Sequence, residues 1–150
     1  MTNQQDSLRI TSISKALAGE DCLLPSFLCG VAAGFPSPAD DYMDKELDLN
    51  ELVIKHPAAT FYVRVEGHSM RDAGIHSGDI LVVDRSLSPS SGKIIVAILN
   101  GEFTVKRLII EEHGTIVLRP ENSNYPPIQV SPEADFQVWG VVTYVIHQAH

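Results

Sequence analysis

The sequence has little cysteine and no clustered metal ligands. Its two cysteines, Cys22 and Cys29, are separated by six residues and lie near the amino terminus, with no second pair of ligands beside them. The six histidines are scattered, and none stands four residues from another or joins the cysteines at zinc spacing. We therefore expect a reducing compartment, no structural disulfide, no bound metal and no cofactor.

Positive charge is also scarce. The chain carries 11 lysines and arginines against 19 aspartates and glutamates, which gives a formal net charge of -8. A protein that holds nucleic acid through a broad surface needs clustered basic side chains to neutralise phosphates. We therefore expect any contact with nucleic acid to be indirect.

No apolar run is long enough to span a membrane, which takes about 20 residues. The apolar stretch 22–33 ends in small residues, as a secretory cleavage region does. However, Glu20 and Asp21 stand where a signal peptide carries positive charge, and Pro25 interrupts the stretch. These features predict a soluble cytoplasmic protein without a membrane contact.

The first 60 residues are more acidic than the rest and hold little regular pattern. In residues 1–20, Leu8, Ile10, Ile13 and Leu17 have a loose spacing that fits a short helix or an irregular arm. Residues 34–41 read GFPSPADD, and two prolines in three residues force extended or turn geometry. We interpret this part as an extended N-terminal arm followed by a linker.

Beyond Thr60 the sequence becomes a series of short segments rich in Val, Ile, Phe and Tyr, separated by Gly, Asn and Ser. Asn100-Gly101 between two apolar runs is the strongest hairpin signal. The fold class predicted is mainly β, with folded or barrel-like antiparallel sheets. The strands are expected at residues 61–66, 80–84, 93–99, 102–110, 115–119 and 136–147.

Ser69 follows the first of these strands, in the segment GHSM at 67–70. A serine at the end of a strand projects its hydroxyl off the sheet, and nearby backbone amides, such as those of Ser69 and Met70, can face a developing oxyanion. Taken alone, a serine in this position is more often a turn or cap residue. The neighbouring His68 should point the opposite way along the strand and is a poor base for Ser69.

Lys106 stands in a predicted strand where alternation puts Thr104, Lys106 and Leu108 on one face. A lysine of ordinary pKa is protonated and cannot act as a base, but burial lowers that pKa. A neutral lysine beside a serine hydroxyl is a known nucleophile and base pair. Taken alone, Lys106 also fits a lysine that protects a sheet edge.

Six motifs occur in this sequence in the same order as in a known family. The sequence resembles the LexA-type self-cleaving peptidases, most closely the UmuD and MucA branch that serves error-prone DNA polymerase V. The resemblance covers roughly residues 30–146. The motifs are AGFPSPADDY at 33–42, GHSM at 67–70, GDILVVD at 78–84, GEFTVKRL at 101–108, RPENSNY at 119–125 and GVV at 140–142.

The resemblance implies that Ser69 is the nucleophile and Lys106 the general base of a peptidase that cuts its own arm. The family cuts Ala-Gly or Cys-Gly bonds, and this arm offers Ala33-Gly34 and Cys29-Gly30. Ala33-Gly34 is preferred because the residues after it match the family's segment after the cut. The predicted organisation is then an arm at 1–33, a linker and first strand region at 34–60, and a peptidase and dimerisation domain at 61–150.

The resemblance also implies partners. In the family a RecA filament on single-stranded DNA promotes cleavage after DNA damage. The shortened product, a homodimer, then joins a UmuC-type Y-family polymerase for translesion synthesis in the SOS response. The arm before Gly34 is longer than expected for this branch. Four points stay open: the role of this longer arm, the polymerase partner, the chromosomal or plasmid origin of the gene, and whether cleavage occurs within one chain or between dimer mates.

Three alternatives are weaker. A LexA-like repressor needs several helices for DNA binding before the cut, and about 33 residues with prolines are too few. A signal peptidase would need a membrane anchor. A non-catalytic module that binds the polymerase with a vestigial Ser-Lys pair is opposed by the intact Ser69, Lys106 and Ala33-Gly34.

Overall fold

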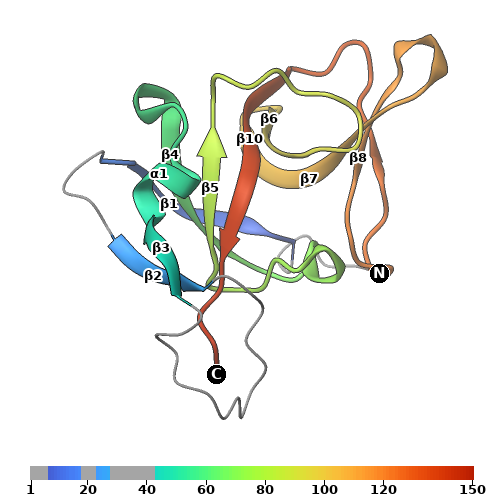
Figure 1. Cartoon of the computed structure of the whole chain (residues 1–150). Helices are drawn as coiled ribbons and strands as arrows, with labels where there is room; N and C mark the ends of the chain where they lie inside the picture. Colours follow the sequence, from blue (N-terminus) through green and yellow to red (C-terminus); the bar gives the residue numbers. More distant parts are fainter. Residues whose placement is uncertain (1–6, 18–22, 28–42) are drawn as a thin grey trace.

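The computed structural model describes residues 7–17, 23–27 and 43–150. Most of them form one curled antiparallel sheet of eight strands, in the order β1-β4-β5-β10-β6-β7-β8-β9 (Figure 1). The strands are β1 (Arg9–Lys15), β4 (Thr60–Glu66), β5 (Ile80–Asp84), β6 (Ile94–Leu99), β7 (Glu102–Ile110), β8 (Ile116–Arg119), β9 (Ile128–Gln129) and β10 (Phe136–Ile146). The mainly β, folded antiparallel class predicted from the sequence is therefore confirmed.

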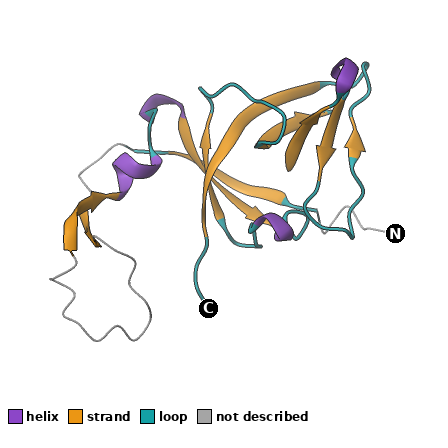
Figure 2. Ribbon diagram, turned by 45° about the vertical axis from the view of Figure 1, so that its right-hand side comes forward, coloured by secondary structure: helices purple, strands orange, loops and turns teal. Residues whose placement is uncertain are grey.

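A second, smaller ribbon lies apart from this sheet (Figure 2). It pairs β2 (Leu23–Phe27) with β3 (Met43–Asp48), and a single helical turn, α1 (Leu49–Val53), follows directly. Asp48 caps this turn because its Oδ1 accepts the backbone N–H of Asn50 at 3.0 Å. Three one-turn 3-10 helices lie in the connections: η3 (Pro57–Ala59) between α1 and β4, η4 (Arg71–Ala73) between β4 and β5, and η5 (Glu112–Gly114) between β7 and β8. Among the described residues, no helix is long and apolar enough to cross a membrane.

The predicted strands match the observed ones to within one residue at each end. The hairpin signal at Asn100-Gly101 is also confirmed. Leu99 pairs with Glu102, and the two turn residues have φ of 50° and 83°, the left-handed geometry that a two-residue hairpin requires. Alternation and turn chemistry therefore predicted the strands beyond Thr60 except the two-residue strand β9.

The arm differs from the prediction. Where the loose apolar spacing favoured a short helix or an irregular segment, the structure has strand β1, paired antiparallel with β4. Leu8 and Ala16, at either end of this strand, are buried. The free edge of β4 supplies the hydrogen bonds, so a tertiary contact decides the local structure of this segment.

The buried hydrophobic residues form two core clusters, one on each face of strand β6. Strand β6 contributes to both, since Val96 faces one cluster and its neighbours Ile95 and Ala97 face the other. The larger cluster contains Leu8 from the arm and Val105 from β7. Curling thus brings the first strands of the sheet close to β7, although three strands separate β4 from β7 in the sheet order.

Candidate active site

Ser69 and Lys106 meet in the interior of the curled sheet. Ser69 lies in the turn after β4 and Lys106 lies in β7, and Lys106 Nζ is 3.2 Å from Ser69 Oγ. Both side chains are buried, with exposed fractions of 0% and 2%. The two residues that the sequence analysis singled out are therefore within hydrogen-bond distance of each other.

The Lys106 amine is surrounded by neutral groups. Its Nζ also lies 3.0 Å from Thr104 Oγ1, 3.2 Å from the Val105 carbonyl and 3.2 Å from Ser7 Oγ. Within the described part of the chain, no carboxylate forms a salt bridge with it. Because burial removes water and no counter-ion compensates, the pKa of Lys106 falls from its ordinary value to about 8. About one fifth of this amine is therefore neutral near physiological pH, far more than for a solvated lysine.

The hydrogen bonds of Ser69 leave its proton available to the amine. Ser69 Oγ accepts the backbone N–H of Leu8 at 3.0 Å. The hydroxyl hydrogen can then point to Lys106 Nζ, which accepts it when the amine is neutral. This is the arrangement in which a base can take the proton of a serine nucleophile.

The turn that holds Ser69 is fixed by a segment from the other end of the sheet. The backbone N–H of Glu121 donates to the Ser69 carbonyl at 2.8 Å, and Asn122 Nδ2 donates to the His68 carbonyl at 2.8 Å. The Glu121 carboxylate is itself paired with Arg107 and Arg119, and the Arg107 hydrogen bond above all holds its pKa below the ordinary range.

Sequence reasoning gave Glu121, Asn122 and Thr104 no role of their own. The first two lie in the motif RPENSNY at 119–125, which entered the sequence analysis only as part of a resemblance. Their function in the structure is to position the Ser69 turn. The side chain of His68 is exposed whereas Ser69 is buried, in agreement with the expectation that they face opposite ways.

Backbone donors are also present beside Ser69. Within the described residues, the N–H groups of Ser69 and Met70 donate no hydrogen bond to the protein. The Met70 side chain is fully buried in the larger core cluster, which fixes the backbone at this point. These are the two amides that the sequence analysis proposed for an oxyanion hole.

A piece of the arm occupies the space in front of the Ser-Lys pair. Ser7 Oγ contacts Lys106 and the Leu8 amide contacts Ser69, so the Ser7-Leu8 peptide lies over both side chains. Gly67 makes this approach possible, because a Cβ there would come within 2.5 Å of the Ser7 carbonyl oxygen, and its φ of +116° is unfavourable for other residues. The predicted cleavage residues, Ala33 and Gly34 or Cys29 and Gly30, lie outside the described residues.

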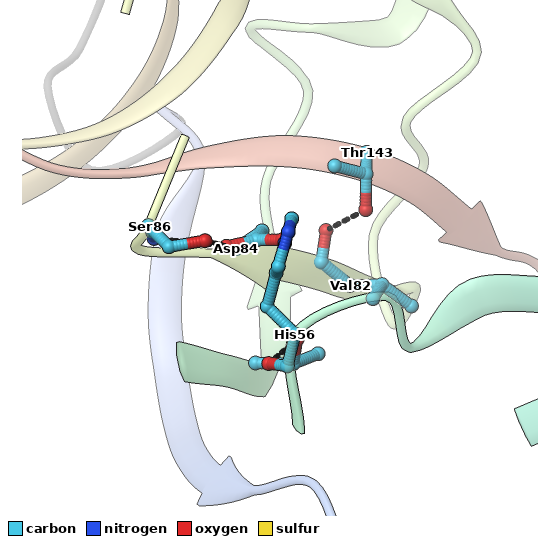
Figure 3. Close-up of polar contacts among 6 residues, drawn as sticks. His56, Val82, Asp84, Ser86 and Thr143 are labelled. Atoms are coloured by element: carbon cyan, nitrogen blue, oxygen red, sulfur yellow. Dashed lines mark hydrogen bonds and ion pairs between the residues drawn. The ribbon is translucent and has the colours of Figure 1, made fainter. Parts of the chain in front are cut away.

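A second group of serine, histidine and aspartate is not a catalytic triad (Figure 3). Ser86 Oγ donates to one oxygen of Asp84 at 2.6 Å, and His56 Nδ1 lies 2.6 Å from the other. Although burial raises the pKa of Asp84, these hydrogen bonds outweigh it and lower the pKa below its ordinary value. The carboxylate stands between the serine and the histidine, whereas a triad needs the histidine in contact with the serine.

The lowered pKa of Lys106 can be measured directly. In the full-length Ser69→Ala chain labelled with ¹³C at lysine Cε, we expect one resonance to titrate with a midpoint near 8, because the amine stays buried among neutral groups. The assignment follows from its loss in the Ser69→Ala, Lys106→Arg double variant. A Lys106 midpoint above about 10, the value of a solvated lysine, would contradict this description of the site.

Comparison with known proteins supports a peptidase. The profile of the family described as Peptidase S24-like matches residues 26–143, a segment that includes both Ser69 and Lys106. Protein MucA of Salmonella typhimurium is 46% identical over 122 residues, which cover 81% of this chain and 82% of the relative. Protein SamA of Salmonella typhimurium is 50% identical over 124 residues, covering 83% and 85%.

A LexA repressor shares the same region. The LexA repressor of Bordetella avium is 39% identical over 140 residues, which cover 91% of this chain and 64% of the repressor. The family match spans well over half of the sequence, and the two relatives above are matched over most of their length. This chain therefore belongs to the Peptidase S24-like family.

Proposed function

We propose that this protein is a serine peptidase that cuts its own N-terminal arm once, with Ser69 as nucleophile and Lys106 as general base. The observation that carries the proposal is the 3.2 Å contact between Lys106 Nζ and Ser69 Oγ in a buried site where no described residue supplies a counter-ion. That environment lowers the pKa of the amine to about 8, which is close to the pH at which a general base works best.

The chemistry follows from the positions of these groups. Lys106 Nζ takes the Ser69 proton while Ser69 Oγ forms a bond to the carbonyl carbon of the scissile peptide. The Ser69 and Met70 amides donate to the resulting oxyanion. The Lys106 ammonium then gives its proton to the leaving amine, and the peptide C–N bond breaks to leave an acyl group on Ser69. Water, deprotonated by Lys106, hydrolyses that ester and regenerates the hydroxyl.

The substrate proposed is the Ala33-Gly34 bond of the arm, with Cys29-Gly30 as the alternative. Small residues suit a narrow site because glycine lets the backbone approach the nucleophile closely. Cleavage at Ala33-Gly34 would remove residues 1–33, including the whole of β1. The remaining chain, 34–150, keeps Ser69, Lys106 and the seven other strands of the large sheet.

The biological role proposed is the one that the family resemblance implies. A RecA filament on single-stranded DNA would stimulate the cut in the cytoplasm during the SOS response. The shortened chain would form a homodimer and serve a UmuC-type translesion polymerase as accessory subunit. The sequence similarity to proteins named MucA and SamA supports this assignment.

The arm segment in front of the dyad suggests how the reaction is restrained. Ser7 and Leu8 occupy the place that a scissile peptide needs, and the Leu8 N–H, rather than a carbonyl carbon, faces Ser69 Oγ. The Leu8 side chain is anchored in the core with an exposed fraction of 2%. Self-cleavage therefore requires this segment to leave before the cleavage segment can enter.

The enzymatic proposal is tested by incubating the purified full-length protein between pH 7 and 10 and measuring intact masses. We expect fragments 1–33 and 34–150, with a rate that rises about tenfold from pH 7 to pH 9 as Lys106 loses its proton, and then levels off. Ser69→Ala and Lys106→Ala should stay intact, whereas Ser86→Ala, which removes the exposed serine that donates to Asp84, should be cut normally.

A wild-type chain that stays intact even with RecA, nucleotide and single-stranded DNA would refute the activity and favour a non-catalytic binding module. Fragments that end at Cys29 would change the bond assigned but leave the Ser69 and Lys106 roles in place.

Competition by the Ser7-Leu8 segment predicts that Leu8→Ala cleaves faster than wild type. Truncating a buried leucine weakens its anchoring by about 2 kcal/mol or more, which corresponds to roughly a thirtyfold larger population of the open site. The matched control is Leu17→Ala on the same arm, because Leu17 is 79% exposed and should have no effect. Cleavage of Leu8→Ala at or below the wild-type rate, in a chain that circular dichroism shows to be folded, would rule out competition.

A further inference from the structure

Two histidines and a buried aspartate meet at the end of the sheet where the chain terminates. Strands β5 and β10 pair antiparallel, and Ile80 at the start of β5 is opposite Ile146 at the end of β10. Asp79 directly precedes β5 and His147 directly follows β10, so the register places them side by side. His76 joins them from the turn before Asp79, and Figure 1 shows the end of β10 beside the start of β5.

The potential ligand atoms of these three side chains all lie within 4.8 Å of one another. His147 Nδ1 is 2.6 Å from Asp79 Oδ1, and His76 Nδ1 is 3.8 Å from Asp79 Oδ2. The two imidazole rings are 4.8 Å apart. Both histidines therefore direct the same ring nitrogen toward one carboxylate.

The surroundings favour a cation. Asp79 is 2% exposed, and within the described residues no lysine or arginine forms a salt bridge with it. Its Oδ2 accepts the backbone N–H of His76 at 2.8 Å, which fixes the carboxylate. That hydrogen bond explains why the aspartate is held in place, but it gives no reason for two imidazoles on one carboxylate.

We propose that His76, Asp79 and His147 form a binding site for a divalent metal ion of the zinc type. Two imidazole nitrogens and one carboxylate oxygen are a ligand set that Zn²⁺ accepts, with the fourth tetrahedral position taken by water. Tetrahedral zinc with bonds of about 2.0–2.1 Å separates its ligand atoms by about 3.3 Å. The 2.6 Å distance runs to Asp79 Oδ1 and the 3.8 Å distance runs to Asp79 Oδ2, so binding of the ion through one oxygen requires both histidine side chains to shift.

Such changes are available because the side chains of His76 and His147 are 48% and 41% exposed, so neither is held by tight packing. A third histidine ring, that of His150, lies 5.7 Å from the His147 ring. Asp79 is the buried ligand, whereas the two half-exposed ligands, His76 and His147, come from segments 71 residues apart in the sequence.

The metal would join the end of β10 to the turn that precedes β5. That turn is also tied to β4, the strand that leads to Ser69, because Gly78 N–H donates to the Val65 carbonyl and Val65 N–H donates to the Asp79 carbonyl. The ion is therefore structural: it contacts neither Ser69 nor Lys106 and takes no part in the reaction proposed above. The site does not depend on whether the protein is a peptidase.

The test uses the full-length Ser69→Ala chain without an affinity tag, so that self-cleavage and tag histidines play no part. Isothermal titration with Zn²⁺ should give one bound ion per chain, and His76→Ala and His147→Ala should each weaken binding by at least about tenfold. His113→Asn is the matched control, because His113 is exposed, lies elsewhere and has a φ of 72° that asparagine tolerates. This control should bind zinc as the parent does.

Thermal unfolding with and without Zn²⁺ distinguishes a variant that has lost a metal ligand from one that has lost its fold. Zn²⁺ should raise the thermal midpoint of the parent chain and of His113→Asn but not that of His147→Ala, since only a ligand that binds the folded state stabilises it. Absence of zinc binding by the parent chain would overturn the proposal. Equal binding by the parent and His147→Ala would also overturn it.

Discussion

The ε-amine of Lys106 lies in the protein interior against the hydroxyl of Ser69, and the rest of the structure is arranged around that contact. Its folded-state pKa of about 8 is below the unfolded value, so the folded chain binds fewer protons between pH 8 and about 10.5 and gains stability as pH rises there. Below about pH 8 the full cost of the buried amine, about 3 kcal/mol, is present. In the proposed mechanism this cost is offset by function, because it places a partly neutral amine beside the hydroxyl of Ser69.

Three parts of the chain share in maintaining the contact. Curling of the sheet brings β7 to the turn after β4, and residues 121–122 hold that turn through two backbone carbonyls. The arm then closes the site, with Leu8 in the larger core cluster and its amide on Ser69. The segment that covers Ser69 is thus part of the core, so the proposed restraint of self-cleavage is tied to the stability of the domain.

Local sequence patterns predicted all strands beyond Thr60 except the short β9, because alternation and turn residues act within a few positions. Ser69 and Lys106 could be named in advance from strand ends and alternation together with a family resemblance, although each alone fits a structural role. Local patterns could not predict contacts between segments that are far apart in the sequence. Strand β1 forms on the edge of β4, and His147 reaches Asp79, 68 residues away, only through the register of β5 and β10.

The central claim is that Ser69, and no other serine, is activated by Lys106. It is tested most directly by treating the protein with a small fluorophosphonate at several pH values and mapping the modified residue by mass spectrometry. The account predicts modification at Ser69 that increases as pH rises through about 8 and is lost in Lys106→Ala, with Ser86 and also Ser7, whose Oγ is 3.2 Å from Lys106 Nζ, unmodified. Modification of Ser86, or modification of Ser69 that is equal in the wild type and Lys106→Ala, would contradict it.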